Sequence, residues 1–346
     1  MSTSAAAASS TSLSSASRRR SSPASRVPAT IRRSLTPQIL SSPSSSSRSP
    51  LVPVYATSSP AAAGGATSRK KLLIFDAEEY LAESLAKYTV RLSEKSTAER
   101  GAFTVALSGG SLIKALRFLS LHKTASSLFL SGIWIIIFGF RRKLAEPPYL
   151  EAVDWSKWHV FWADERVVLK DHADSNYKLA MDGLLSKVPI PASQIYAIND
   201  ALSAEGAADD YETCLKQLVT NGVITMSQAT GFPKFDLMLL GMGPDGHVAS
   251  LFPGHPVVNE NQKWVSYIKD SPKPPPERIT FTFPVVNSSA QIALVVTGAG
   301  KAGAVHKALT NKQSSSDLLP VEMVSLQDGV LTWFTDKPAV SMLSRI

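Results

Sequence analysis

The stretch at residues 235–247 reads FDLMLLGMGPDGH, an unbroken apolar run that ends in a glycine-rich turn and a histidine. Apolar runs without alternation are typical of strands that are covered on both faces. The pattern recurs at 103–111 (FTVALSGGS), 158–166 (WHVFWADER) and 291–303 (QIALVVTGAGKAG). Because these runs alternate with amphipathic stretches, the sequence predicts an α/β fold built on a mostly parallel sheet.

Other segments complete this prediction. Further strands are expected at 71–75, 279–283 and 331–335, and helices at 79–93 and 209–219. In the first of these helices, Leu81, Leu85 and Tyr88 recur on one face. We therefore expect a single Rossmann-like α/β domain over residues 70–346, with helices on both faces of the sheet.

The first 67 residues have a different composition. They hold seven arginines, no lysine and no acidic residue, and they are rich in serine, alanine and proline. Such a segment buries too little apolar surface to fold, and its make-up is that of an organelle transit peptide. We expect a disordered plastid transit peptide over 1–67, and hence a chloroplast location. A disordered tail without a targeting role is the alternative.

The leader also accounts for most of the charge. The formal net charge of the chain is +8, and the seven leader arginines leave about +1 for the remainder. Nucleic acid is therefore not an expected partner. The one cysteine, Cys214, excludes an intramolecular disulfide and a cysteine-rich metal site. The apolar run at 128–140 is shorter than the roughly twenty residues that span a bilayer, so no membrane contact is expected.

Three glycine-rich turns follow predicted strands. The first holds Ser108, Gly109, Gly110 and Ser111. Small residues let backbone N–H groups approach an anion, and the following helix N-terminus adds favourable partial charge. This turn is a candidate phosphate cradle, with a plain turn as the alternative. The other two match G-x-G-x-x-G at 241–246 and 298–303, but both come too late to open a dinucleotide-binding unit, which argues against an NAD-dependent oxidoreductase.

Charged residues follow the same strands. His247 should lie at the carboxyl edge of the sheet, where open α/β folds bind ligands, and a neutral imidazole there can take a proton from water. Asp164 and Arg166 could orient a polyol or a carboxylate, and Arg278 and Lys301 could supply cations to a phosphate. An isolated surface histidine and solvated surface charges are the respective alternatives. His255, eight residues on, is expected to be structural rather than a metal ligand.

Together these motifs resemble the 6-phosphogluconolactonase family in its plant plastid type. The matching stretches are SGGS at 108–111, FWADERVV at 161–168, DSNY at 174–177, DLMLLGMGPDGHVASLFP at 236–253, RIT at 278–280 and GAGKA at 298–302. The resemblance spans residues 72–341 apart from one segment. It implies the fold shared with glucosamine-6-phosphate deaminases, the sugar-phosphate isomerase/deaminase-like form of the α/β class.

Two departures from the deaminase pattern favour the lactonases. Deaminases carry Asp-Glu-Tyr where this chain has Asp164-Glu165-Arg166. They also continue after the histidine with Ile-Ala-Phe-Asn-Glu-Pro, whereas VASLFP follows His247 here. The acidic partner of the deaminase mechanism is therefore missing at that place.

The resemblance implies hydrolysis of a small phosphosugar lactone, 6-phospho-D-glucono-1,5-lactone, to 6-phosphogluconate in the oxidative pentose phosphate pathway, without metal or other cofactor. It also implies the site residues. His247 acts as general base, Asp245 orients the loop or the imidazole, and Arg166 stabilises the oxyanion or the product carboxylate. Asp164 binds sugar hydroxyls, and the phosphate is held by Ser108, Gly109, Gly110, Ser111, Arg278 and Lys301. A non-catalytic sugar-phosphate-binding protein and a deaminase-like isomerase are the alternatives. The oligomeric state is left open, with a monomer among the options.

Residues 118–142 do not fit the family pattern. Joining Arg117 to Lys143 restores KALRKLAEPP, a continuous helix followed by a loop similar to the family's. We therefore interpret 118–142 as an insertion of about 25 residues. A retained intron or a mis-called splice junction is the preferred origin, and a lineage-specific insertion is the alternative.

Overall fold

The computed structural model describes residues 54–55, 69–109, 140, 143–310 and 317–343. The chain divides into two units, Met1–Pro50 and Leu51–Ile346, and every described residue belongs to the second. The expected transit peptide apart from 54–55, the expected insertion apart from Phe140, and the site residues Gly110 and Ser111 therefore lie outside the described residues.

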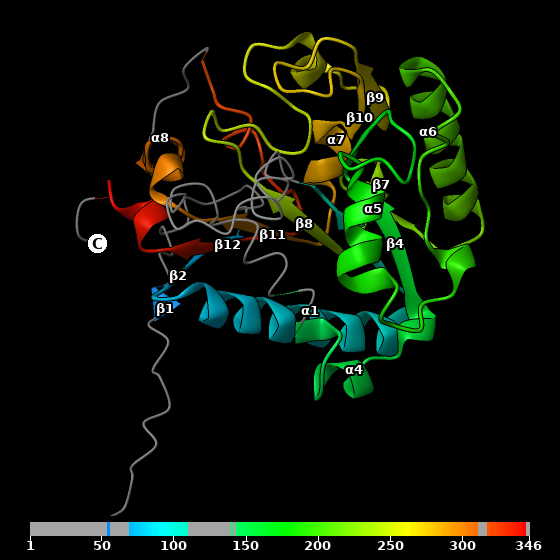
Figure 1. Ribbon diagram of the computed structural model, residues 1–346, viewed down its shortest axis with the longest axis horizontal. Helices are drawn as coiled ribbons and strands as arrows, with labels where there is room; N and C mark the ends of the chain where they lie inside the picture. Colours follow the sequence, from blue (N-terminus) through cyan, green and yellow to red (C-terminus); the bar gives the residue numbers. More distant parts are fainter. Residues whose placement is uncertain (1–53, 56–68, 110–139, 141–142, 311–316, 344–346) are drawn as a thin grey trace, which may run out of the picture. The chain divides into compact units, whose positions relative to one another are not determined.

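A seven-stranded sheet forms the centre of the described unit (Figure 1). Its order is β1 (Val54–Tyr55), β2 (Arg69–Phe75), β12 (Val330–Asp336), β11 (Gln291–Val296), β8 (Leu237–Gly241), β3 (Phe103–Leu107) and β4 (Trp158–Trp162). Neighbouring strands from β2 to β4 all run parallel, whereas β1 pairs antiparallel with β2. The mostly parallel sheet predicted from the apolar runs is confirmed.

Apolar clusters cover both faces of this sheet. Ala106 and Met238 lie in one cluster, and their neighbours Val105 and Leu237 lie in the other. The division arises because successive side chains of a strand point to opposite faces. Buried side chains of α6 (Ala204–Thr220) belong to the first cluster, and those of α1 (Glu78–Arg100) belong to the second. Helices on both faces, as predicted, therefore shield the strands from water.

Local signals set the ends of these helices. α1 is longer than the helix expected at 79–93, and it ends where Gly101 adopts a left-handed φ of 75°. α6 begins where the hydroxyl of Ser203 accepts the N–H of Gly206. The other α-helices within the described residues are α4 (Tyr149–Ala152), α5 (Asn176–Ala180), α7 (Phe283–Asn287) and α8 (Ala302–Thr310). Short 3₁₀ or π turns are η1 (Trp155–Lys157), η2 (Met181–Leu185), η3 (Ala192–Gln194), η4 (Pro256–Asn259), η5 (Ala299–Lys301) and η6 (Pro338–Val340).

A second, antiparallel sheet adjoins the carboxyl end of β4. Its order is β5 (Asp164–Arg166), β10 (Arg278–Phe281) and β9 (Val265–Ile268), and a separate pair joins β6 (Thr225–Met226) to β7 (Pro233–Lys234). The strand expected at 279–283 is β10 of this sheet, and it ends early because α7 begins at Phe283 with Pro284 in its first turn.

Ala163 alone separates β4 from β5. Its N–H donates to the carbonyl of Leu107 in the large sheet at 2.8 Å. Its carbonyl accepts the N–H of Phe281 in the small sheet at 2.7 Å. One residue thus joins the two sheets and fixes where β5 starts.

The parallel strands bring several turns to one edge. The carboxyl ends of β3, β8 and β11 are followed by Ser108, by the 241–247 turn and by Gly298. Since these strands are parallel neighbours, their carboxyl ends lie at the same edge of the sheet. Within the described residues, the helices are too short or too polar to cross a bilayer.

Candidate active site

His247 and Asp245 are held by the turn that follows β8. Gly246 has a left-handed φ of 79°, its N–H donates to the carbonyl of Gly243, and the N–H of Gly243 donates to the carbonyl of His247. A Cβ added at Gly243 would overlap the imidazole of His247 and the carboxylate of Asp245. The turn therefore needs glycine where backbone and imidazole meet.

The imidazole of His247 is bonded to Asp245. Its Nδ1 lies 2.5 Å from Oδ1 of Asp245. A carboxylate only accepts hydrogen bonds, so we assign the ring proton to Nδ1. The lone pair of Nε2 is then free to accept a proton from another molecule.

Burial keeps this imidazole neutral. The residue is 8% exposed, and its ring packs on Phe252 with the ring centroids 4.7 Å apart. Burial, followed by the charge of Lys273, lowers the pKa of His247 against the opposing effect of Asp245. Burial alone would raise the pKa of Asp245, but the hydrogen bond from His247 and the charge of Lys273 outweigh it and lower that pKa. A neutral base beside an ionised carboxylate is suited to general base chemistry.

Lys273 is a site residue that the sequence analysis missed. Its Nζ lies 3.1 Å from each carboxylate oxygen of Asp245 and 3.0 Å from Nδ1 of His247. It lies on the segment between β9 and β10, far along the chain from the histidine turn. The signal that could have found it is the run PKPPPER at 272–278, a stiff segment that leads into the strand starting at Arg278.

The guanidinium of Arg278 hydrogen-bonds to that same segment at 272–278. It is 2% exposed, its Nε donates to the carbonyl of Pro275 at 3.0 Å, and its Nη2 donates to the carbonyl of Lys273 at 2.7 Å. Its Nη1 makes a long contact of 3.4 Å with the hydroxyl of Ser250. Burial, then the charge of Arg166, lowers the pKa of Arg278 to about 10, so the group stays charged at neutral pH. Nη1 retains donor capacity for an anion.

Asp164 connects the two turns that flank the site. It is 2% exposed, and its Oδ1 accepts the hydroxyl of Ser108 at 2.7 Å. Its Oδ2 accepts the hydroxyl of Ser250 at 2.9 Å. The carboxylate thus ties the start of the predicted phosphate turn to the segment after His247. Ser250 was not predicted from sequence.

Side chains alternate between the two faces of β5, so Glu165 lies on the opposite face from Asp164 and Arg166. The carboxylate of Glu165 accepts the backbone N–H groups of Arg166, Asn176 and Tyr177, each at 2.7 Å. Burial nonetheless raises the pKa of Glu165 to about 7, against the effect of these hydrogen bonds. Glu165 therefore anchors the start of α5.

Arg166, at the end of β5, has a guanidinium whose donors are only partly hydrogen-bonded among the described residues. Nη1 of Arg166 donates to the carbonyl of Asp174 at 2.8 Å, while its buried Nε lacks a hydrogen-bond partner among the described residues. Arg166 lies directly across from Arg278 in the β5–β10 register. Two guanidinium groups side by side favour an anion between them.

Lys301 completes the cationic surroundings. It lies in η5, at the turn after β11, and its pKa is lowered to about 8 by burial and then by the charge of Lys273, while Asp245 opposes the shift. The charges of both Lys273 and Asp245 thus act on the ammonium of Lys301. Of the predicted phosphate turn, the structure describes Ser108 and Gly109, where an added Cβ would overlap the amide of Asn176.

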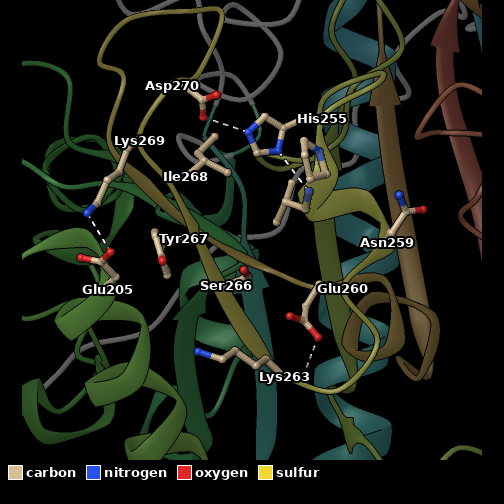
Figure 2. Close-up of a pocket in the computed structure, with 12 residues that line it drawn as sticks. Glu205, His255, Asn259, Glu260, Lys263, Ser266, Tyr267, Ile268, Lys269 and Asp270 are labelled. Carbon is tan, nitrogen blue, oxygen red and sulfur yellow. Dashed lines mark hydrogen bonds and ion pairs between the residues drawn. The ribbon is translucent and has the colours of Figure 1, made fainter.

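A cleft of about 710 Å³ lies on β9, η4 and the start of α6, and none of the predicted site residues lines it (Figure 2). Within it His255 bonds Asp270 at 2.9 Å and Lys269 bonds Glu205 at 2.7 Å, so these two basic side chains are already paired. His255 also accepts the N–H of Val257 and caps η4, a structural role as expected. Among the described residues no cluster of histidine, cysteine and carboxylate could hold a metal.

Comparisons with known proteins show the family of the chain. A family model described as glucosamine-6-phosphate isomerases/6-phosphogluconolactonase matches residues 76–333. The chain belongs to this family. Relatives that are named as lactonases, described next, confirm the predicted family and the predicted hydrolase class.

Two of these relatives are plant proteins. "Probable 6-phosphogluconolactonase 3, chloroplastic" of Oryza sativa subsp. indica is 75% identical over 329 residues, which cover 94% of this chain and 93% of that protein. "6-phosphogluconolactonase 3, chloroplastic" of Arabidopsis thaliana is 58% identical over 279 residues, 81% of this chain and 77% of that protein. Their names also confirm the predicted chloroplast location.

Solved structures share the family's fold. The devB protein is 27% identical with a TM-score of 0.65, and the match covers 80% of this chain and all of that chain. A monomeric glucosamine-6-phosphate deaminase is 18% identical with a TM-score of 0.57, over 79% of this chain and 99% of that chain. The predicted kinship in fold between lactonases and deaminases is confirmed.

Proposed function

We propose that this chain hydrolyses 6-phospho-D-glucono-1,5-lactone to 6-phosphogluconate, with His247 as the general base, as a step of the oxidative pentose phosphate pathway. The observation that carries the proposal is the buried His247–Asp245 pair, joined at 2.5 Å, in which no described residue hydrogen-bonds to Nε2. The ammonium of Lys273 contacts this pair, and further cations of the site are proposed to hold the phosphate and the developing negative charge of the substrate.

In the proposed binding step, the 6-phosphate lies at the turn formed by Ser108, Gly109, Gly110 and Ser111. Lys301 and the free donor capacity of Arg278 neutralise its charge. Asp164 orients the sugar hydroxyls. Binding the phosphate at one end holds the C1 carbonyl against His247 at the other, which converts the reaction with water into an oriented encounter.

In the proposed chemical step, Nε2 of His247 takes a proton from water as the water oxygen bonds to C1. The C1 carbonyl becomes a tetrahedral oxyanion, which the guanidinium of Arg166 stabilises. Collapse of this intermediate breaks the bond between C1 and the ring oxygen, and the proton on His247 passes to that oxygen. A lactone is an activated ester, so the route uses no metal, redox cofactor or covalent nucleophile.

The test is a coupled assay that follows 6-phosphogluconate formation, corrected for spontaneous lactone opening. His247→Ala is expected to lower kcat by about 10²–10⁴-fold while the protein remains folded. Near-normal turnover in that variant would remove His247 as the base. Binding of 6-phosphogluconate without any acceleration by the native chain would instead favour a non-catalytic sugar-phosphate-binding protein, and release of ammonia from glucosamine 6-phosphate would favour the deaminase-like isomerase.

The same assay addresses the expected insertion. We propose that a variant lacking residues 118–142 folds and hydrolyses the lactone, because joining Arg117 to Lys143 restores the family-like helix. Sequencing the transcript across these two codons distinguishes a retained intron from an inherited insertion.

A further inference from the structure

We infer that Lys273 is a positioning residue for His247: it clamps the Asp245 carboxylate against Nδ1 and opposes protonation of the imidazole. The inference rests on the proposed role of His247 as general base. Lys273 itself transfers no proton.

The contacts around Asp245 define the clamp. The ammonium of Lys273 reaches both carboxylate oxygens at 3.1 Å, and Oδ1 also accepts Nδ1 of His247 at 2.5 Å. Oδ1 is thus shared between the two partners, and Oδ2 is held by Lys273. A carboxylate bonded in this way has little freedom to rotate away from the imidazole.

The contact between the Lys273 ammonium and the imidazole disfavours a positive charge on His247. Nζ of Lys273 lies 3.0 Å from Nδ1 of His247. With the ring proton on Nδ1 and directed at Asp245, this contact joins two donors and is not a hydrogen bond. An imidazolium would be repelled by the ammonium at this distance, and the repulsion is strong because the ring is buried. Lys273 therefore shifts the imidazole toward the form that can accept a proton.

Other groups around the imidazole of His247 shift its pKa in both directions. Asp245 and Asp164 favour the imidazolium, whereas burial and Lys273 disfavour it, and the net effect lowers the pKa of His247. Phe252 covers one side of the ring without charge. Lys273 is therefore a cation that offsets the two carboxylates near the base, and Lys301, on which Lys273 and Asp245 both act, is a further cation in this region.

The backbone holds Lys273 in place. Its carbonyl accepts Nη2 of Arg278 at 2.7 Å and the hydroxyl of Ser271 at 2.8 Å, and Nε of Arg278 anchors Pro275. Arg278 is buried in β10, so the segment is fixed to the small sheet. The backbone that carries Lys273 is thus held by Arg278 and Ser271, and its ammonium is held by the contacts with Asp245.

The experiment compares Lys273→Met, Lys273→Arg and the control Lys269→Met. Lys269 lies four residues earlier, is exposed, and bonds Glu205 in the cleft of Figure 2. Steady-state kcat and kcat/KM are measured against pH, and isotope-labelled histidine reports the titration of His247 by NMR.

Lys273→Met is expected to raise the acid-limb pKa of kcat/KM by about one unit, because loss of a nearby positive charge stabilises the imidazolium. It is also expected to lower kcat about tenfold through loosening of the Asp245–His247 pair. Lys273→Arg should return the acid limb toward the native position, and Lys269→Met should change neither quantity. The NMR titration of His247 should shift with the kinetic limb.

Two outcomes would overturn the inference. A rise in KM alone, with the acid limb and the histidine titration unchanged, would make Lys273 a substrate-binding cation. A loss of kcat with both titrations unchanged would make its role merely structural. If Lys273→Met does not fold, Arg278→Lys tests the same support, and an unmoved acid limb there contradicts the inference equally. Full activity of His247→Ala would instead reject the proposed base, independently of any result at Lys273.

Discussion

Arg278 lies directly opposite Arg166 on the antiparallel strands β10 and β5, and both are buried. Two like charges in such a pair destabilise the folded chain unless an anion or nearby carboxylates offset them. Asp164 and Asp174 contribute part of that offset at Arg278. The pair is therefore preset for a ligand with negative charge.

Replacing Arg166 tests whether the arginine pair binds negative charge during the reaction. Arg166→Gln is expected to lower kcat/KM by about 10²–10³-fold, because a donor to the developing oxyanion is lost. Arg166→Lys should recover little, since an ammonium lacks the planar fork of a guanidinium. Steady-state kinetics provide the measurement, and unchanged kcat/KM in Arg166→Gln would place the oxyanion elsewhere.

Binding of product offers a second test of the two arginines. 6-Phosphogluconate at 100 times its Kd is expected to stabilise the native chain by about 2.7 kcal/mol, seen as a higher Tm. The shift should be smaller at the same concentration in Arg166→Gln. An equal shift in both proteins would mean that the arginine pair does not contact the ligand.

Gly243 gives a steric prediction. Gly243→Ala is expected to lower kcat at least about tenfold, because its Cβ would displace the imidazole of His247. The matched control is Gly303→Ala in α8, where an added Cβ meets open space. The control should keep full activity and gain about 0.5–1 kcal/mol of stability. Equal activities of the two variants would contradict the proposed position of the ring.

His247 and Asp245 also predict how stability depends on pH. Both have folded-state pKa values below their ordinary values, so the unfolded chain binds more protons as pH falls through those ordinary values. Their contribution to stability is present above these values and is lost toward acid. The free energy of unfolding is measured in urea for the native chain and for His247→Gln across pH 5 to 7. It should fall more steeply toward acid in the native chain.

For Glu165 the dependence of folding stability on pH has the opposite sign. Its pKa is raised from 4.5 to about 7, so the folded chain binds the extra proton between these values and stability falls as pH rises through them. Glu165→Ala should cost roughly 2–4 kcal/mol, because three backbone N–H groups lose their acceptor. Glu94→Ala, at an exposed position on α1, is the control and should change unfolding by less than about 0.5 kcal/mol. Equal unfolding curves would exclude the anchoring role.

Sequence patterns predicted the edge of the sheet where chemistry is expected, because each apolar run before a glycine turn proved to be a covered parallel strand. His247 and Asp245 could be placed there because they are two residues apart in one turn. Lys273 could not, because it reaches His247 from a different segment, 26 residues along the chain. Nothing in local spacing encodes such a tertiary approach.

Arg278 shows a second limit of prediction from sequence. Its charge and its place at the start of a strand suggested a phosphate ligand, and that role remains a proposal. The structure shows that Nε and Nη2 already serve the carbonyls of Pro275 and Lys273. The number of donors left for a ligand depends on tertiary hydrogen bonds, which residue type alone does not reveal.

The single-residue joint at Ala163 has a genetic consequence. Strand side chains alternate between faces, so Asp164 and Arg166 share one face while Glu165 takes the other. Loss or gain of one codon at this joint would exchange those faces, turning the anchoring carboxylate toward the proposed substrate site and the two groups proposed to bind the substrate toward α5. In-frame length changes at codon 163 should therefore behave as null alleles, whereas exchange of its alanine for another small residue should be tolerated.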